Sequence, residues 1–297
     1  MDKVYVDMLF AEKALPNRPQ ESNKGTFGRI LAVIGSQKYP GAMHLAAEAM
    51  LRGGAGYTEV LSTAEVRDGL LIKFPEIIFG IISGKFDSKD CKIIKERAEN
   101  ADCILIGPGC GASETLGEVI ISLLSSKGAP IVIDADGINS LALLKDRALS
   151  ALKNPERETI LTPHPLEFSR LSSIPIETVN LQREKVVSDF ASEYKVTLLL
   201  KGKNTLIAYG KELFVNTTGS SALAKAGSGD TLAGLLSSLL ATRMIETKKA
   251  AAISAFIHGA AGDKLAEKYS EFGVTPSDLP KEMASVILEI NRRKCKQ

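Results

Sequence analysis

The sequence is poor in the residues that build metal, disulfide or stacking sites. Its 297 residues include no tryptophan, three histidines and four cysteines, and aromatic residues make up only 5%. The cysteines stand at positions 91, 103, 110 and 295 and form no C-x-x-C pair, so neither a zinc site nor a disulfide framework is expected. The few aromatic side chains also argue against an aromatic-rich binding surface.

Charge and hydropathy exclude two further classes of protein. The 37 basic and 35 acidic residues leave a net charge of +2, which is too weak to hold a polyanion over a broad surface. No segment has about 18 uninterrupted apolar residues, and the start, M-D-K-V-Y-V-D-M, lacks the charged-then-apolar pattern of a signal peptide. We therefore expect a cytoplasmic protein with reduced thiols that binds neither nucleic acid nor membrane.

The sequence does contain a recurring unit: a short run of Val, Ile and Leu, a loop with glycine, then a helical period. Continuous apolar strands that alternate with helices indicate an α/β fold, with a mostly parallel central sheet flanked by helices on both faces. Three further strands follow each other too closely for helical crossovers, which predicts a small antiparallel patch near 196–216. The strands expected are 29–34, 57–61, 104–106, 130–134, 159–162, 196–200, 205–209 and 212–216.

No long linker and no internal repeat divides the chain, so residues 1–297 are expected to form a single domain, with 1–25 as a lead-in arm. Three helices near 230–243, 248–269 and 278–292 are expected to close it. In such folds the ligand lies beyond the carboxyl ends of the strands. The loops at that edge are therefore where chemistry is expected.

The strongest candidate loop is A-G-S-G-D-T-L-A-G at 226–234, which opens an apolar helix. Gly227 and Gly229 would expose backbone amides at the positively polarised helix start, an arrangement that suits a phosphoryl group. A carboxylate beside a bound phosphate is repelled, so Asp230 indicates a catalytic base. The competing interpretation is that Asp230 only caps the helix.

A second candidate is G-P-G-C-G-A at 107–112, which follows a strand and precedes a helix. With Asp134 at the end of the next strand it fits a Rossmann fingerprint, although Pro108 stiffens the turn and no second nucleotide-binding half is evident. The alternative is a tight turn that forms one wall of a pocket. No P-loop occurs, so any nucleoside phosphate must be held by another architecture.

Two shorter loops follow other strands. In T-P-H-P-L-E at 162–167, the prolines on either side of His164 fix its backbone, which favours a functional role over a surface loop in which Pro165 starts a helix. K-G-K-N-T at 201–205 offers groups for a phosphate or ribose, or is a plain hairpin turn. His44 and His258 lie in helical patterns and are expected to be ordinary helix residues.

These four segments, in this order, resemble the ribokinase-like superfamily, in which a G-x-G-D loop takes the place of a P-loop. The closer resemblance is to the ADP/ATP-dependent NAD(P)H-hydrate dehydratases, and it runs from about Ser22 to the last helix. Two segments depart from it: T-G-S-S-A-L at 218–223 stands for T-G-N-P-G-M, and Cys110 for a leucine. The matching segments are K-G-T-F-G-R-I-L-A-V-I-G-S (24–36), Y-P-G-A (39–42), L-R-G-G-A-G (51–56), G-P-G-C-G (107–111), D-A-D-G-I-N (134–139), L-T-P-H-P-L-E-F (161–168), L-K-G-K-N-T (200–205), N-T-T-G (216–219) and A-G-S-G-D-T-L-A-G (226–234).

The resemblance implies roles for individual positions. Asp230 would be the base, with Gly227 and Gly229 as the anion hole. Glu167 falls where the wider superfamily places the glutamate of N-x-x-E near Mg²⁺, although histidine stands at 164 in place of that asparagine. Either glycine of the 107–111 turn could contact the substrate. The implied substrate contacts are Ala42, Gly109, Gly111, His164 and Asp230. The implied nucleotide contacts are Lys201, Gly202, Lys203, Asn204, Thr205 and Gly229.

The same resemblance implies the reaction. Hydrated NADH or NADPH would be phosphorylated on its C6 hydroxyl by ADP or ATP with Mg²⁺, and phosphate would then leave. A homo-oligomer, a tetramer, is implied, with a separate NAD(P)H-hydrate epimerase acting upstream, since only about two dozen residues precede the match. The rival functions are a small-molecule kinase using the same loop, and an NAD-binding regulatory protein without turnover built on 107–134.

Overall fold

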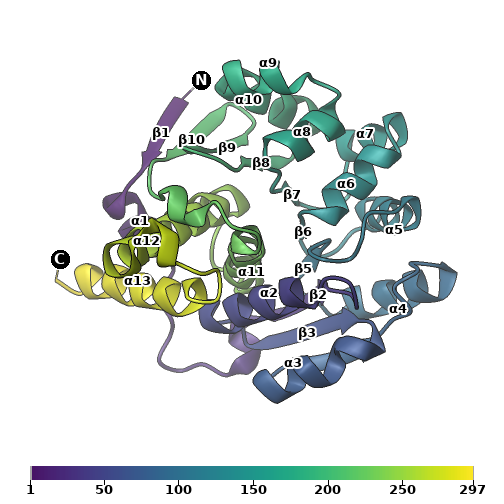
Figure 1. Cartoon of the computed structure of the whole chain (residues 1–297), viewed down its shortest axis with the longest axis horizontal. Helices are drawn as coiled ribbons and strands as arrows, with labels where there is room; N and C mark the ends of the chain where they lie inside the picture. The colour runs from purple at the N-terminus through teal and green to yellow at the C-terminus, as the bar shows by residue number, and fades with distance from the viewer. Residues whose placement is uncertain (1, 297) are drawn as a thin grey trace.

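One twisted sheet organises the chain. A computed structural model describes residues 2–296, and within them ten strands form a single sheet in the order β1-β10-β9-β8-β7-β6-β5-β2-β3-β4 (Figure 1). The strands are β1 (Asp2–Val6), β2 (Arg29–Val33), β3 (Tyr57–Ser62), β4 (Ile78–Ile81), β5 (Cys103–Ile106), β6 (Ile131–Ile133), β7 (Thr159–Leu161), β8 (Thr197–Leu200), β9 (Thr205–Tyr209) and β10 (Glu212–Asn216).

The predicted fold class is confirmed. Strand β9 runs antiparallel to both of its neighbours, β8 and β10, and the other paired strands are parallel. The antiparallel patch therefore lies where the closely spaced strands predicted it, because the hairpins at 201–204 and 210–211 leave no room for a crossover helix.

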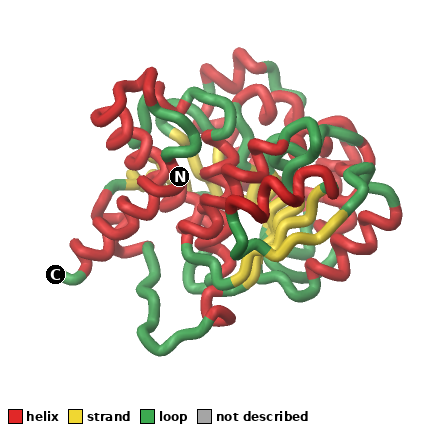
Figure 2. The backbone as a smooth tube through the Cα atoms, turned by 60° about the horizontal axis from the view of Figure 1, so that its bottom comes forward, coloured by secondary structure: helices red, strands yellow, loops and turns green. Residues whose placement is uncertain are grey.

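Helices cover both faces of the sheet (Figure 2). In β2, Ile30 and Ala32 join the core on one face while Leu31 and Val33 join the core on the other, so positions 30–33 are all buried in hydrocarbon. The first face carries α1 (Met8–Ala14), α2 (Pro40–Gly53), α3 (Arg67–Lys73), α11 (Ser228–Ala241), α12 (Thr247–Gly273) and α13 (Leu279–Lys294). The second face carries α4 (Ser88–Ala98), α5 (Glu114–Leu124), α6 (Asp136–Leu143), α7 (Asp146–Lys153), α8 (Pro165–Ser172), α9 (Ile176–Leu181) and α10 (Arg183–Tyr194).

The start of the chain differs from the expected lead-in arm. Most of the described part of 1–25 is regular: β1 pairs in parallel with β10 at one edge of the sheet, and α1 packs near α12 and α13. Only 15–23 is an irregular loop, which Arg18 fixes by stacking 3.4 Å over the ring centroid of Phe27. The five-residue strand D-K-V-Y-V escaped prediction because its charged residues interrupt the apolar run.

The closing helices lie where they were expected, within a few residues, and α11 packs against α2 through small side chains (Figure 1). Gly234 lies so close to α2 that a β-carbon there would stand 2.4 Å from the carbonyl oxygen of Ala46. The hydroxyl of Ser238 donates to the carbonyl oxygen of Met50 at 3.0 Å. These two contacts hold the middle and the last turn of α11 against α2. None of the helices within residues 2–296 combines the length and hydropathy that a membrane span requires.

We expect Gly234→Ala to lower the free energy of unfolding by about 1–3 kcal/mol, because the added methyl group collides with the α2 backbone. Alanine normally favours a helix over glycine by about 1 kcal/mol, so the loss would run against helix propensity. Gly69→Ala in α3 is the matched control, since its nearest neighbour would be an ordinary 3.8 Å contact with His44. Urea unfolding measures both, and equal stabilisation by the two substitutions would contradict close packing at Gly234.

Candidate active site

The candidate site lies at the carboxyl ends of the central parallel strands. Loops that follow β2, β5, β6, β7 and β8 meet there, and the N-terminus of α11 faces the same edge (Figure 1). Each loop named from the sequence belongs to this edge, as the rule for open parallel sheets predicts.

Gly227 shapes the start of α11. It is the N-cap residue, it adopts φ +101°, and a β-carbon there would stand 2.4 Å from the side chain of Leu45. The amide of Ser228 donates back to the carbonyl oxygen of Lys225 at 3.2 Å, which closes the turn. Asp230 lies in the first turn of the helix, so it is not the cap, and the capping interpretation of Asp230 is wrong.

Lys201 reaches into this edge and pairs with buried carboxylates. Its ammonium nitrogen lies 2.8 Å from Oδ1 of Asp134 and 3.9 Å from Oε2 of Glu167. The same nitrogen would be 3.2 Å from a β-carbon on Gly229. Lys201 therefore also lies against residues 227–229, which we call the anion loop. Lys201 thereby connects the ends of β6, β7 and β8 to the start of α11.

The surroundings of Asp230 oppose its ionisation. Burial raises its pKa to about 7, with a further contribution from Asp134, while Lys201 acts in the other direction. Burial also works against the charge on Lys201, but Asp134 and Glu167 outweigh it, so the pKa of Lys201 is raised. Asp230 is thus a carboxyl group that changes protonation state near neutral pH, which is the property a general base requires.

His164 caps α8. Its Nδ1 accepts hydrogen bonds from the amides of Leu166 and Glu167, at 3.1 and 3.2 Å, and the Glu167 carboxylate accepts from the His164 amide at 2.8 Å. Pro165 is the first helical residue, so this part of the less favoured interpretation of the loop is confirmed. Because Nδ1 accepts, the proton is on Nε2, which lies 3.4 Å from Glu167. Burial and the nearby Lys201 lower the pKa of His164, so the ring is neutral at neutral pH.

The G-P-G-C-G turn is engaged within the protein. The amide of Gly111 donates to the carboxylate of Asp136 at 2.8 Å, and the amide of Gly107 donates to Val33 at 3.1 Å. A β-carbon on Gly109 would stand 2.8 Å from the methyl carbon of Ala42, whereas one on Gly111 would meet nothing within 4 Å. These bonds occupy amides that a Rossmann fingerprint would offer to a pyrophosphate, so the turn is better described as a wall beside Ala42.

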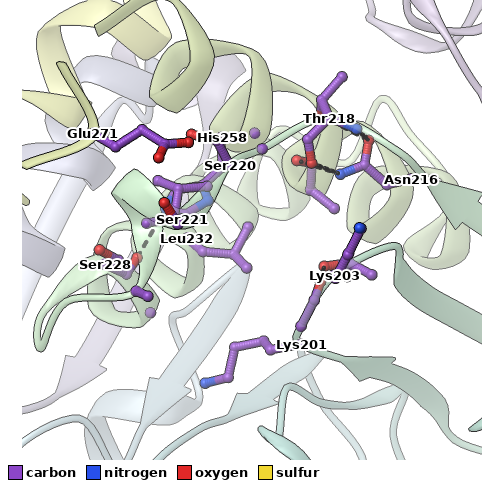
Figure 3. Close-up of a pocket in the computed structure, with 18 residues that line it drawn as sticks. Lys201, Lys203, Asn216, Thr218, Ser220, Ser221, Ser228, Leu232, His258 and Glu271 are labelled. Atoms are coloured by element: carbon purple, nitrogen blue, oxygen red, sulfur yellow. Dashed lines mark hydrogen bonds between the residues drawn. The ribbon is translucent and has the colours of Figure 1, made fainter. Parts of the chain in front are cut away.

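A cavity of about 550 Å³ opens between the hairpin after β8 and the start of α11 (Figure 3). Lys203 and Lys201 both line it, but their side chains extend in different directions, that of Lys203 towards Asn216. Asn204 occupies the turn with φ +54° and is not part of the wall. The lining residues are Lys201, Gly202, Lys203, Thr205, Asn216, Thr218, Gly219, Ser220, Ser221, Leu223, Ala224, Ser228, Gly229, Leu232, Ala255, His258, Gly259 and Glu271.

The N-T-T-G segment fastens the far wall of this cavity to α12. The Asn216 amide group donates to the carbonyl oxygen of Ala255 at 3.1 Å, and the hydroxyl of Thr218 donates to that of Phe256 at 3.1 Å. A β-carbon on Gly259 would stand 2.2 Å from the Thr218 hydroxyl oxygen. Polar residues in this motif therefore shape the cavity rather than fill it.

The structure thus separates two groups of predicted residues. All of the predicted nucleotide contacts except Asn204 line the cavity. The predicted substrate contacts lie outside its wall: Ala42, Gly109, Gly111, His164 and Asp230. The sequence did not reveal the role of Asp134, which stood in the rival Rossmann motif and in one segment of the family resemblance without a function. The helical pattern also predicted His258 as an ordinary helix residue, although this side chain lines the cavity and contacts the anion loop. No local pattern marks either residue, because each gains its partner from a distant part of the chain.

Comparison with known proteins decides the family. The family model described as NAD(P)H-hydrate dehydratase matches residues 30–285, which is most of the chain and includes every loop of the site. The chain belongs to the NAD(P)H-hydrate dehydratase family. The resemblance noted from the sequence motifs is thereby confirmed.

Curated members of the family include both short and long chains. The ADP-dependent (S)-NAD(P)H-hydrate dehydratase of Listeria monocytogenes is 32% identical over 276 residues, covering 92% of each chain. The bifunctional NAD(P)H-hydrate repair enzyme of Moorella thermoacetica is 34% identical over 270 residues, which is 89% of this chain. This chain spans only about half the length of the bifunctional relatives it matches.

Solved structures agree with the family assignment. An ADP/ATP-dependent NAD(P)H-hydrate dehydratase from Bacillus subtilis, co-crystallised with ATP and Mg²⁺, superposes with a TM-score of 0.84 at 26% identity, covering 98% of this chain and 99% of that one. A ribokinase from Thermotoga maritima, 13% identical, has a TM-score of 0.54 over 88% of this chain and 98% of its own, which shows a shared fold.

Asp230→Asn is expected to stabilise the folded protein, and more so at pH 8 than at pH 5. A free aspartate titrates near 3.9, whereas Asp230 titrates near 7, so between these values the folded state binds more protons than the unfolded state. The free energy of unfolding therefore falls as pH rises through this window, and asparagine removes that loss. We expect the gain to be ~1–3 kcal/mol larger at pH 8.

Urea unfolding of both proteins at the two pH values measures this difference. Asp189→Asn on the exposed face of α10 is the matched control. A pH-independent effect of Asp230→Asn would mean that Asp230 has the same pKa folded and unfolded.

Proposed function

We propose that this chain catalyses the ADP- or ATP-dependent dehydration of hydrated NADH or NADPH, which restores NADH or NADPH and so repairs a damaged cofactor. Family membership supports this proposal. The observation that carries it in the structure is the position of Asp230, a half-buried carboxyl group in the first turn of α11, with a pKa of about 7, beside a helix start that suits a phosphoryl group.

The first step uses the anion loop and the base together. The nucleotide occupies the 550 Å³ cavity, with its phosphates directed at the start of α11 and Lys201. Asp230 accepts the proton of the C6 hydroxyl while the hydroxyl oxygen attacks the terminal phosphoryl group of the nucleotide. That group is the β-phosphoryl of ADP or the γ-phosphoryl of ATP. The bond to the leaving AMP or ADP breaks, and amides including that of Gly229 stabilise the transferred charge.

The second step is an elimination. The lone pair of the ring nitrogen assists departure of phosphate from C6, and loss of a proton from C5 restores the ring double bond. The net reaction converts ATP to ADP, or ADP to AMP, and the elements of water leave the substrate as its C6 oxygen in the phosphate and a proton. The chemistry is therefore that of a lyase on a kinase fold. Ala42, Gly109 and Gly111 would leave room for the substrate, and His164 would hold it.

The residues present fit a Mg²⁺ ion that arrives with the nucleotide. Within residues 2–296 no cluster of three or more metal-ligating side chains forms a cage. Mg²⁺ is commonly bound by one or two carboxylates together with substrate phosphates, and the buried Glu167 beside Lys201 is the carboxylate that would hold it. When bound, the ion supplies positive charge that offsets the charge of the phosphates.

Four further features belong to this proposal. The chain would act in the cytoplasm, as a single domain within a homotetramer, and a separate NAD(P)H-hydrate epimerase would act upstream. The cytoplasmic assignment is supported by the cysteines, which are all unpaired within residues 2–296. Size-exclusion chromatography with light scattering measures the oligomeric state.

The decisive experiment incubates the protein with hydrated NADH, Mg²⁺ and either ADP or ATP. A rise in absorbance at 340 nm with an equal release of phosphate supports dehydration. A stable phosphoester without the absorbance rise would instead identify a small-molecule kinase. Binding of NAD without nucleotide consumption would identify a binding protein and overturn the proposal.

The rate should follow the ionisation of Asp230. A base must be unprotonated to act. A plot of kcat/KM against pH should therefore rise about tenfold per pH unit at acidic pH and level off above about pH 7. Asp230→Asn cannot accept the proton and should lose about 10²–10⁴-fold in kcat. Steady-state rates between pH 5 and pH 9 measure both effects. A variant that keeps more than a tenth of the rate would remove Asp230 from the role of base.

His164→Asn should separate substrate binding from helix capping. Asparagine is a good N-cap residue, so the variant should keep the stability of α8, whereas His164→Ala should lose about 0.5–2 kcal/mol. If the imidazole contacts the substrate, both variants should lose about 10–100-fold in kcat/KM for hydrated NADH and keep their affinity for ADP. Kinetics with calorimetric titration of ADP measure this, and full activity of the asparagine variant would reduce His164 to a cap.

A further inference from the structure

His258 is the buried imidazole that the proposed mechanism leaves without a role. It lies on α12, on the far side of the anion loop from Lys201, and Figure 3 shows it among the residues that line the cavity. Its side chain is almost wholly enclosed, with 7% of the residue exposed. A polar ring in such a place requires a specific partner.

That partner is the main chain of the anion loop. Nε2 of His258 lies 2.9 Å from the carbonyl oxygen of Ser228, and a carbonyl can only accept, so Nε2 carries the proton. Burial lowers the pKa of His258 to about 4, so the ring is neutral and offers this single N–H at neutral pH. The contact joins the middle of α12 to the first residue of α11.

A second side chain donates to the same oxygen. The hydroxyl of Thr231, which is fully buried, lies 2.8 Å from the carbonyl oxygen of Ser228. This oxygen also belongs to the main-chain ladder of α11, in which each carbonyl ordinarily accepts one amide. The Ser228 carbonyl therefore accepts two side-chain donors beyond what helix formation supplies.

The carbonyl of Ser228 and the amide of Gly229 belong to one peptide group. Donors on the oxygen of a peptide polarise it and strengthen its N–H as a donor, because hydrogen bonds in series reinforce each other. They also fix its direction. The peptide needs such fixing, since it follows Gly227, with φ +101°, and precedes a second glycine, and glycine restricts the backbone least.

We propose that His258 and Thr231 are positioning residues, which hold and polarise the Ser228–Gly229 peptide so that its amide is presented to the phosphoryl group in transfer. The predicted effect on rate rests on the proposed phosphoryl transfer. The hydrogen bonds to the peptide can be tested without that reaction. His258→Leu removes the donor at similar size, and His258→Gln keeps an N–H on a side chain of similar reach. Thr231→Val removes the hydroxyl, and Thr231→Ser keeps it.

The kinetic test compares these four variants with hydrated NADH and ADP. His258→Leu and Thr231→Val should each lose about 10–100-fold in kcat, with KM for hydrated NADH within about twofold of wild type, because the peptide contacts only the group in transfer. His258→Gln and Thr231→Ser should recover most of the loss. The double variant should lose less than the product of the single losses, since both donors serve one oxygen.

Thr58→Val is the matched control. Thr58 lies buried on β3, and its hydroxyl has no hydrogen-bond partner within the described residues, so its removal should leave kcat unchanged. An equal loss of kcat in Thr231→Val and Thr58→Val would overturn the positioning role. So would an increase in KM with kcat unchanged.

A spectroscopic readout keeps the inference independent of the reaction. In protein labelled with ¹⁵N-glycine, the amide proton of Gly229 should move upfield in His258→Leu and in Thr231→Val, both free and with ADP, as its peptide loses polarisation. His258→Gln and Thr231→Ser should return it towards the wild-type position. If wild type fails to convert hydrated NADH while these shifts occur, the proposed function falls and the inference stands. Unchanged Gly229 shifts in the variants would overturn the inference.

Discussion

A single half-buried ammonium group holds the parts of this site together. Lys201, 20% exposed at the end of β8, pairs with Asp134, which is 1% exposed at the end of β6. The charge of Asp134 is not tolerable alone in that position, because an unpaired buried ion costs several kcal/mol. The pair therefore fixes the spacing of the strands at their carboxyl ends. It also places a positive charge against Gly229 and a negative one near Asp230, where burial is the main cause of the raised pKa and Asp134 adds to it.

The helix start is held from the other sides by neutral contacts. Small residues let α11 lie directly on α2, with the carbonyl of Ala46 close to Gly234, and His258 reaches the first turn from α12. A close backbone contact at Gly234 and a hydrogen bond at Ser228 thus constrain the first half of α11 from α2 and from α12. Such a segment needs little reorganisation when charge develops beside it, which is how fixed dipoles contribute most to catalysis.

The sequence predicts the sheet better than it predicts the site. Runs such as I-L-A-V at 30–33 are apolar at every position because both faces of the sheet are covered. Such a run can be recognised from the sequence alone. Strands β1 and β4 escaped prediction, because charged residues interrupt the apolar run of β1 and Gly80 interrupts that of β4. Within the site, motifs located the loops correctly. They did not reveal that His164 caps a helix through Nδ1, or that Asp134 holds Lys201, since both depend on atoms that meet only after folding.

The pairing of β1 with β10 has a consequence for the way the chain is made. Residues 2–6 leave the ribosome before the rest of the sheet, yet their partners at 212–216 follow more than 200 residues later. At about 5–20 residues per second, the first strand waits on the order of ten seconds or more for its neighbour. Strands β2 and β3, separated by one helix, can pair long before that. Strand β1 and the α1 helix behind it are thus synthesised before the other elements of the sheet, yet they are among the last to be ordered.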